Sequence, residues 1–282
     1  MRLDATQEEQ EFATWLFNTG HARNNTDAHG HIHLPEAIRC GNSVDDLIQA
    51  IYPGVANLNP AMNNDPYFSA RTILSARNDD VDSLNHQILA AFTGEEKVFH
   101  SADSVISERG VDADLINQYP IEYLNSINLS GMPLAKLQLK IGAPIMILQN
   151  LDPAGGVCNG TRGILTQCTN HVLEMRILGG DFAGQTTFIP RLTITPSDSD
   201  LPFQLSRRQF PARLAFSMSI NKAQGQSVSH VGLDLHTPVF THGQLYVALS
   251  HCTSSTRIKV LFPMQATTTE TMNIVYPEVL LN

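Results

Sequence analysis

The sequence predicts an α/β domain that is interrupted by a small module of β-strands. Residues 70–92 contain a short apolar strand, a polar turn and an amphipathic helix, which together form half of a βαβ unit. After residue 136 the pattern changes to short alternating strands separated by Gly and Pro, and near residue 210 buried strands return. We therefore assign residues 1–136 and 210–282 to a domain with a parallel sheet, and residues 137–209 to an inserted small β-barrel.

The helices of the α/β part are predicted from local signals. Residues 7–19 follow a polar cap and carry apolar side chains at helical spacing. Ser43 is a suitable N-cap for a helix over residues 43–51, and the acids of its first turn suit the positive end of the helix dipole. Two further helices are expected, at residues 78–92 and 243–250.

The strands are predicted from short apolar runs that are bounded by turn residues. In the α/β part they are expected at residues 70–78, 96–105, 212–220, 228–235 and 256–262. In the inserted module, residues 137–151 are extended and apolar, and Asn159-Gly160 predicts a tight hairpin turn.

Composition narrows the class of protein. The chain has 282 residues, of which 42% are hydrophobic and 16% charged, and this balance indicates a folded globular protein. No run of 18 or more apolar residues occurs, so we expect no membrane span and no membrane partner. The N-terminus lacks the features of a signal peptide, and the four cysteines have no Cys-x-x-Cys spacing. We expect free thiols and an intracellular protein, nuclear or cytoplasmic.

The charge is unevenly distributed along the chain. The net charge is −9, which argues against a surface coated with basic residues for nucleic acid. Residues 205–216 are nevertheless basic, with Arg207, Arg208 and Arg213, and Lys222 follows. A local basic patch on an acidic body suits a site that follows a single strand better than one that coats a duplex.

A polar segment follows the strand predicted at residues 212–220, and it is the most specific chemical signal. It carries Ser219, Asn221, Lys222 and Gln224, and then Gly225, which allows the backbone to approach a ligand closely. Loops at the carboxyl ends of strands are where α/β sheets bind ligands. From the residues alone, an ordinary solvated loop remains open. A phosphate-binding loop of the form Gly-x-x-x-x-Gly-Lys-Ser/Thr does not occur in the sequence.

The sequence resembles the PIF-type DNA helicases, including the related Helitron transposon helicases. RRQFPARLAFSMSINKAQGQSVSHVGL (207–233) and HGQLYVALSHCTS (242–254) resemble helicase motifs V and VI of that family. Further segments match in the same order, at residues 73–85, 96–105, 119–163 and 189–198. The resemblance implies that residues 1–136 and 210–282 form the second RecA-like domain of a 5′-to-3′ helicase, with residues 137–209 inserted in it.

The resemblance also implies the partners and the cofactors. The first RecA-like domain, with its Walker loop and magnesium site, would lie upstream of Met1 or be supplied in trans. ATP and Mg²⁺ are then expected to bind only when that domain is present, and this chain alone is not expected to hydrolyse ATP. Arg2 would reach the γ-phosphate, as the arginine of the family's motif IV does. The expected partner is single-stranded DNA, bound by a monomer.

His251 departs from the family pattern. Motif VI normally reads Tyr-Val-Ala-Leu-Ser-Arg, and its arginine is a finger that meets the γ-phosphate. Composition alone would place His251 on the surface at the end of a helix. Histidine is shorter than arginine and is mostly neutral at pH 7, so we expect weak ATP hydrolysis even with the partner domain restored.

By the same resemblance, the remaining site residues divide between DNA and nucleotide. Ser219, Asn221 and Lys222 would face single-stranded DNA, with Gln224 and Gly225 nearer the nucleotide. Asn159 and Arg162 either contact DNA phosphates or only help to form the turn. His86 either faces the DNA groove or is merely solvated.

The histidines His21, His29, His31 and His33 could converge in part, because alternate residues of a strand share one face. No carboxylate or thiol clearly completes a shell, so we expect no metal site.

Two other functions remain open. The chain could be a non-catalytic remnant of a transposon-type helicase that only binds single-stranded DNA, a hypothesis that His251 supports. Alternatively, it could be a protein-interaction module that has lost both activities. In that case Lys222→Ala and Arg162→Ala would leave binding to the true partner intact.

Overall fold

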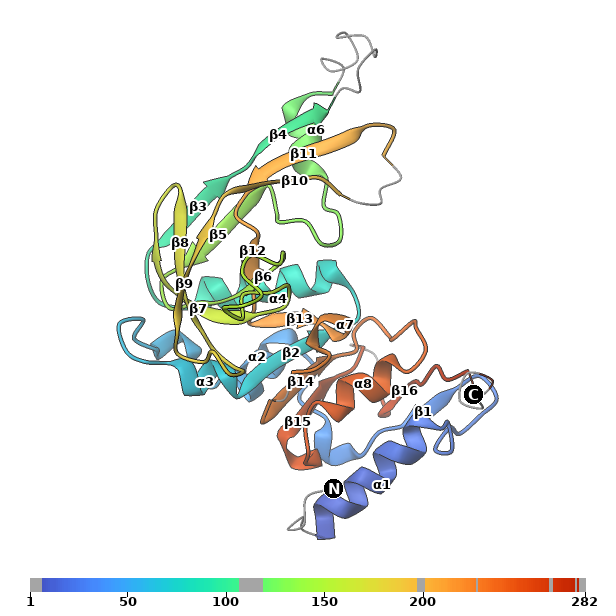
Figure 1. Cartoon of the computed structure of the whole chain (residues 1–282). Coiled ribbons are helices and arrows are strands. Elements are labelled where there is room, and N and C mark those ends of the chain that lie inside the picture. The colour runs from blue at the N-terminus through green and yellow to red at the C-terminus, as the bar shows by residue number, and fades with distance from the viewer. Residues whose placement is uncertain are drawn as a thin grey trace. The chain divides into compact units, whose positions relative to one another are not determined.

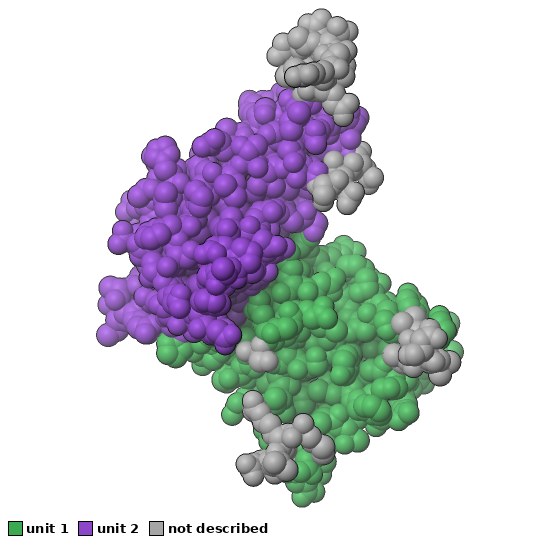
Figure 2. All heavy atoms as spheres, in the orientation of Figure 1, with its two compact units in different colours: residues 1–56, 66–91, 216–282 green, residues 57–65, 92–215 purple. Residues whose placement is uncertain are grey.

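The computed structural model describes residues 7–106, 119–196, 201–226, 228–263, 266–276 and 278. The chain divides into two compact units, drawn in green and purple in Figure 2. The first, here called the α/β unit, comprises residues 1–56, 66–91 and 216–282. The second, here called the β-rich unit, comprises residues 57–65 and 92–215.

Four parallel strands form the sheet of the α/β unit (Figure 1). In spatial order they are β13 (Ser217–Ser219), β2 (Arg71–Ser75), β14 (His230–Asp234) and β15 (Ile258–Leu261). The register aligns Ser219 with Ser75 and Ser75 with Asp234, so three strands end in polar residues at one edge. Because all four strands run the same way, the loops that follow them meet at this edge.

Two helices, α2 (Val44–Ile51) and α4 (Asn78–Ala91), pack against this sheet. The N-cap predicted at Ser43 is confirmed: its hydroxyl accepts the amide N–H of Asp46 at 3.1 Å. The Asp46 carboxylate accepts the amide N–H of Ser43 at 3.0 Å, which completes a capping box. The packing of α2 requires the glycine at position 232, because a Cβ there would lie 2.8 Å from the Ile51 side chain.

The predicted helices at residues 7–19, 78–92 and 243–250 are confirmed within one residue at each end. The other elements of the unit are α1 (Gln7–Gly20), β1 (His31–His33), η1 (Glu36–Ile38), α7 (Ile220–Ala223), α8 (Gln244–Ser250), η3 (Ser255–Arg257) and β16 (Glu270–Met272). Two short turns, η2 (Val55–Asn57) and α3 (Asp65–Ser69), lie at the unit boundaries. None of the described helices is long and apolar enough to cross a membrane.

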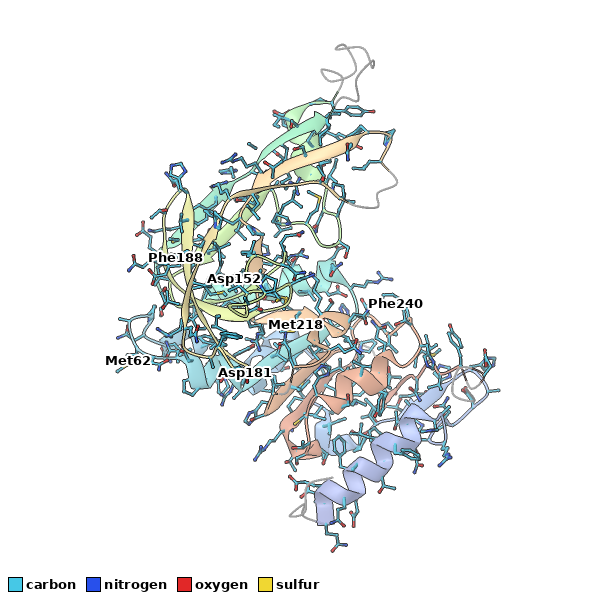
Figure 3. All side chains as sticks on the ribbon, in the orientation of Figure 1. Met62, Asp152, Asp181, Phe188, Met218 and Phe240 are labelled. Atoms are coloured by element: carbon cyan, nitrogen blue, oxygen red, sulfur yellow. The ribbon has the colours of Figure 1, made fainter. Side chains whose placement is uncertain are left out.

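The β-rich unit is built from antiparallel strands in three sheets (Figure 1). The five-stranded sheet has the order β12 (Ala212–Leu214), β6 (Pro144–Ile147), β7 (Arg162–Cys168), β8 (Val172–Ile177), β9 (Thr186–Pro190). The second sheet has the order β10 (Leu192–Ile194), β11 (Gln204–Gln209), β4 (Ala102–Ile106). The third pairs β3 (Glu96–His100) with β5 (Lys136–Lys140), and the described residues of this unit also include the helix α6 (Ile121–Ser126). Side chains alternate along β9, where Phe188 is exposed and Ile189 is buried (Figure 3).

The structure changes the predicted organisation of this region in two respects and leaves a third unconfirmed. A closed barrel is not confirmed, because the described five-stranded sheet ends at β12 and β9. The unit is not confined to residues 137–209 but comprises residues 57–65 and 92–215, since β3 pairs with β5 and β4 pairs with β11. The single strand predicted at residues 212–220 is two strands: β12 pairs with β6, and β13 pairs with β2 in the other unit.

A buried ion pair joins β4 and β11 in the β-rich unit. Nη2 of Arg207 lies 2.6 Å from Oδ2 of Asp103, and the two side chains are 1% and 0% exposed. The same guanidinium donates to the main-chain carbonyls of Leu124, Ile127 and Pro133 at 2.9–3.1 Å. Arg207 therefore holds the irregular segments around α6 against the sheet, because it supplies the donors that these carbonyls need.

Candidate nucleic-acid interface at the sheet edge

The polar segment predicted as a ligand site lies at the carboxyl edge of the parallel sheet. Strand β13 ends at Ser219, the single turn α7 follows, and Gly225 adopts a φ of +84° that favours glycine. Ser219 is half-buried and Asn221 is exposed. The segment thus presents polar side chains and accessible backbone at the edge where open α/β sheets bind ligands.

The strand that leads into this segment is fixed by a buried amide. Asn85 on α4 is 3% exposed, and its Nδ2 donates to the carbonyl of Ser217 at 3.0 Å. Its Oδ1 accepts the amide N–H of the same residue at 2.8 Å. The reciprocal pair gives β13, an edge strand, partners for both main-chain groups of Ser217. Asn85 therefore positions the polar segment from the covering helix.

His251 is not a surface residue. It caps the C-terminus of α8 and is 9% exposed. Its Nδ1 lies 2.5 Å from the carbonyl oxygen of Val247, and its Nε2 lies 2.7 Å from the carbonyl oxygen of Ala223, the last residue of α7. A neutral imidazole donates from one nitrogen only, whereas the imidazolium donates from both. The ring ties α8 to the end of α7 whenever Nε2 carries the proton, and because both nitrogens face carbonyls, neither presents an N–H group outward.

A buried carboxyl lies at the same edge. Asp234 ends β14, is 4% exposed, and accepts the amide N–H of His236 at 3.0 Å. Burial raises the pKa of the Asp234 carboxyl above its ordinary value, and the nearby charge of Asp80 raises it further, against the lowering effect of that hydrogen bond. The edge therefore combines exposed polar groups with a carboxyl that holds its proton more tightly than usual.

Comparison with known proteins identifies relatives for most of the chain. The family described as DNA helicase Pif1, 2B domain, matches residues 122–168, within the β-rich unit. The human ATP-dependent DNA helicase PIF1 is 30% identical over 233 residues, which cover 82% of this chain and 32% of the human protein. The chain is a relative of the PIF-type DNA helicases and matches their C-terminal part. It spans about a third of the length of the curated relatives that it matches.

The fold of this chain resembles solved structures of Pif1 helicases. The crystal structure of Bacteroides Pif1 in complex with ADP-AlF3 and ssDNA aligns with a TM-score of 0.57 and 21% identity, over 96% of this chain and 52% of that one. The crystal structure of Pif1 helicase from Candida albicans aligns with a TM-score of 0.54 and 23% identity, over 89% and 53%. At these identities the likeness establishes the RecA-like α/β fold and does not assign residue roles.

The five residues predicted around α7 are brought together in one short segment. Asn221, Gln224 and Gly225 are exposed, and Lys222 is half-buried. Their predicted contacts with DNA and nucleotide stay predictions. Arg2, expected at the γ-phosphate of a PIF-type enzyme, lies outside the described residues.

The two site residues predicted in the β-rich unit behave differently from each other. Asn159 is exposed in a turn in which the amide of Thr161 donates to the carbonyl of Cys158 at 3.0 Å. Gly160 has a φ of +91°, and the geometry matches a type II turn. The predicted tight hairpin is wrong, because residues 148–161 separate the paired strands β6 and β7. Arg162, in contrast, is 8% exposed and donates to the carbonyl of Ala215 at 3.1 Å. The structure does not support Arg162 as a phosphate contact, because its side chain is buried in its own unit.

The predicted basic patch is likewise corrected. Arg207 and Arg213 are buried, and only Arg208 of the three arginines is exposed. His86 is half-buried, and its Nδ1 lies 2.7 Å from the carbonyl oxygen of Asp82 on its own helix. The basic segment thus contributes to the interior of the β-rich unit more than to its surface.

In the histidine-rich segment around residues 21–33, His31 pairs with the Asp27 carboxylate. Nδ1 of His31 lies 2.7 Å from Oδ2 of Asp27. The amide N–H of His31, and after it this side-chain contact, lower the pKa of Asp27 to about 2. Across the described residues, no three His, Cys, Asp or Glu side chains are placed to hold one metal ion.

Sequence reasoning missed Asn85, Asp234 and a pocket in the β-rich unit. Asn85 lies among apolar residues at helical spacing, which could have marked it as a buried amide. Asp234 lies in an otherwise apolar strand, and a lone carboxylate there is unusual.

Proposed function

We propose that this chain contributes the second RecA-like domain of an ATP-dependent 5′-to-3′ DNA helicase. It binds single-stranded DNA and senses the γ-phosphate, and it does not hydrolyse ATP by itself. The observation that carries the proposal is that residues 219–225, which resemble helicase motif V, lie at the carboxyl edge of the parallel sheet.

The DNA-binding part of the proposal follows from the chemistry of this edge. Asn221 and Gln224 supply amide donors and acceptors, Lys222 supplies a positive charge, and Gly225 leaves the backbone open. Polar side chains, lysine and main-chain N–H groups are the donors that contact phosphate and sugar without reading sequence. A related Bacteroides Pif1 has been solved with ssDNA, which supports the same partner for this chain.

The nucleotide part requires a second domain. No Gly-x-x-x-x-Gly-Lys-Ser/Thr loop occurs in the 282 residues, so this chain has no phosphate-cradling loop of its own. We propose that ATP and Mg²⁺ bind only together with a first RecA-like domain, in cis or in trans. Arg2 is the proposed γ-phosphate contact, on the basis of the motif resemblance alone.

His251 explains why hydrolysis would be weak even in such a complex. Both of its ring nitrogens face main-chain carbonyls, so the side chain at this position carries no donor toward a phosphate. Loss of an arginine finger reduces turnover by about 10³–10⁵-fold in phosphoryl-transfer enzymes.

DNA binding is tested with Lys222→Gln and oligo(dT) in a fluorescence anisotropy titration at several salt concentrations. We expect the variant to bind about 5–10-fold more weakly, with the salt slope reduced by about 1, as for loss of one phosphate contact. The matched control is Arg23→Gln, which removes an exposed charge from the turn after α1. Equal affinity and slope in both variants would overturn the DNA-binding role of this edge.

The nucleotide role is tested in a fusion with a PIF-type first domain, by comparing its steady-state ATP turnover with that of its His251→Arg variant. We expect turnover to rise by at least about 10-fold, toward the arginine-finger range. Equal turnover would contradict the finger interpretation. If DNA binding holds while both fusions stay inactive, the chain is instead the non-catalytic DNA-binding remnant.

A further inference from the structure

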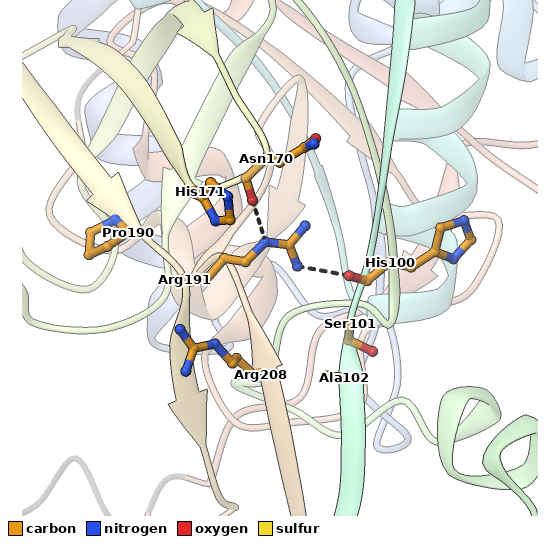
Figure 4. A pocket seen from close by; sticks show the side chains of 8 residues that line it. All are labelled: His100, Ser101, Ala102, Asn170, His171, Pro190, Arg191 and Arg208. Carbon is orange, nitrogen blue, oxygen red and sulfur yellow. Dashed lines mark hydrogen bonds between the residues drawn. The ribbon is translucent and has the colours of Figure 1, made fainter.

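A pocket of about 390 Å³ in the β-rich unit has a strongly basic lining (Figure 4). Four segments contribute to it: the β3–β4 junction, the β7–β8 hairpin turn, the β9–β10 junction, and β11. Its lining residues are His100, Ser101, Ala102, Asn170, His171, Pro190, Arg191 and Arg208. Two arginines and two histidines line it, and none of its described lining residues is a carboxylate, although the chain as a whole carries a net charge of −9.

Arg191 is held rigidly in this pocket. Its Nε donates to the carbonyl of Asn170 at 2.8 Å, and its Nη1 donates to the carbonyl of His100 at 2.8 Å (Figure 4). Nη1 also donates to Oε1 of Gln209 at 3.0 Å, and the guanidinium lies 4.6 Å from the ring centroid of Phe210. No hydrogen bond from Nη2 is found within the described part of the chain. A guanidinium fixed in this way loses little side-chain entropy when its remaining donors bind a ligand.

Gln209 reinforces that arrangement from below the surface. It is fully buried, and its Nε2 donates to the carbonyl of Phe99 at 2.9 Å. With its amide oriented in this way, its Oε1 is available to accept from Arg191. The arginine is thus positioned by a side chain that is itself fixed, the arrangement that precise binding sites require.

Arg208 faces the pocket beside Arg191 without an opposing charge. It follows the buried Arg207 on β11, so strand alternation turns it outward. Among the described residues it has no ion-pair partner. Burial lowers the pKa of the Arg191 guanidinium, and the like charge of Arg208 lowers it further.

Ser101 adds an unused donor to the lining. Its hydroxyl is buried, and it forms no hydrogen bond to any residue that the structure describes. A buried hydroxyl without a partner is destabilising, and rotation toward a bound acceptor would satisfy it.

We propose that this pocket binds the phosphoryl group of a phosphate ester or of free phosphate, held between Arg191 and Arg208. Guanidinium groups match the oxygens of phosphate with paired N–H donors, and Arg191 presents its donors in a fixed orientation. The anion would also relieve the repulsion between the two arginines. The site lies in the β-rich unit, so it goes beyond the DNA-binding role proposed for the edge of the parallel sheet.

The phosphoryl group has two sources, a polynucleotide backbone or free inorganic phosphate. Two titrations of the full chain distinguish them: oligo(dT) followed by fluorescence anisotropy, and inorganic phosphate followed by ¹H–¹⁵N NMR of the Ala102 and His171 amides. Both use the wild type, Arg208→Gln and the matched control Lys97→Gln, which removes an exposed charge from β3 outside the pocket. Arg208 is chosen because it is exposed, whereas Arg191 also donates hydrogen bonds to the main-chain carbonyls of Asn170 and His100. Replacing Arg191 would therefore disturb the local structure as well as the pocket.

We expect Arg208→Gln to weaken binding at least about 5-fold in one or both titrations, while Lys97→Gln changes it less than about 2-fold. An effect in the oligonucleotide titration identifies backbone phosphate, and an effect confined to inorganic phosphate identifies the free anion. Equal behaviour of the two variants in both titrations, or no binding by the wild type, overturns the proposal. The phosphate titration does not depend on residues 219–225, so a failure of the DNA-binding role there remains distinguishable.

Discussion

The two units differ in the side chains that donate hydrogen bonds to main-chain carbonyls outside their regular helices and strands. In the β-rich unit several of the buried donors are charged, and the amide of Gln209, which donates to the carbonyl of Phe99, is a neutral exception. Arg207 donates to three loop carbonyls, Arg162 donates to the carbonyl of Ala215, and Lys140 donates to the carbonyl of Phe92 at 2.7 Å.

The described part of the α/β unit buries no lysine or arginine. Its buried carbonyls are met by amides, a phenol, an imidazole, the Thr269 hydroxyl and the Cys40 thiol. Asn85 donates to the carbonyl of Ser217, and Tyr52 donates to the carbonyl of Phe216 at 2.5 Å. His251 lies against two carbonyls at the end of α8.

The difference in donor type follows from how the main-chain groups of each unit are hydrogen-bonded. A parallel sheet covered by helices satisfies most main-chain groups internally, so single neutral donors are enough at its margins. Short antiparallel sheets joined by irregular segments leave several carbonyls close together, and one guanidinium can reach three of them. The cost is desolvation of the charge, which makes the loss of a buried cation more damaging than the loss of a neutral donor.

The largest effect is expected for Arg207→Leu, which leaves the Asp103 carboxylate buried without its partner. Breaking a buried ion pair in this way costs about 3–5 kcal/mol of unfolding free energy. Urea unfolding followed by far-UV circular dichroism reports on both units, whereas fluorescence of Trp15, the only tryptophan, reports on the α/β unit. We expect the dichroism transition to shift to lower urea much more than the fluorescence transition.

Arg208→Gln is the control for this prediction, because it changes the neighbouring exposed arginine and is expected to alter stability by less than about 0.5 kcal/mol. The double variant Arg207→Leu, Asp103→Leu should recover much of the loss. A loss below about 1 kcal/mol in Arg207→Leu would show that the charged donor is no more important than a neutral one.

An intermediate effect is expected for Asn85→Leu in the α/β unit. The change leaves both main-chain groups of Ser217 without the side-chain partner that they now have. We expect a loss of about 2 kcal/mol, measured by urea unfolding with Trp15 fluorescence. Gln87→Leu, at an exposed position on the same helix, is the control and should be nearly neutral. A loss as large as that of Arg207→Leu would break the contrast between the units.

Much of the α/β unit could be predicted from the sequence because its signals are local. The capping box at Ser43 and the apolar spacing of residues 78–92 depend only on neighbours along the chain. The placement of residues 219–225 at a ligand-binding edge was also predictable, since a strand followed by polar residues ends at such an edge when the sheet is parallel.

The burial of arginines could not be predicted in the same way. Nothing in the pair Arg207-Arg208 shows which side chain points inward, because that depends on how β11 pairs with β4 and β10. The burial of Arg162 depends on β7 lying near the carbonyl of Ala215, which is 53 residues away along the chain. The contacts of His251 likewise require α7 to pack against α8. Each depends on tertiary pairing rather than on local sequence.

The smallest effect is expected at Asp234, the buried carboxyl of the α/β unit. Its folded-state pKa is raised above the ordinary value of 3.8 by burial, so the folded protein holds this proton to higher pH than the unfolded chain does. Stability must then fall as pH rises from 3.8 through the folded pKa, because ionisation places a charge in the interior. Asp234→Asn keeps an oxygen to accept the His236 amide and cannot ionise.

Asp234→Asn should therefore be more stable than the wild type above this window, by about 1 kcal/mol, and the two should converge at low pH. The measurement is the difference between their unfolding free energies from urea titrations at a series of pH values, in which the other titrating groups cancel. Parallel curves would mean that the carboxylate is accommodated as a charge. The α/β unit would then tolerate a buried charge as the β-rich unit does, and the contrast would be confined to the buried partner of opposite charge that Asp103 has in Arg207.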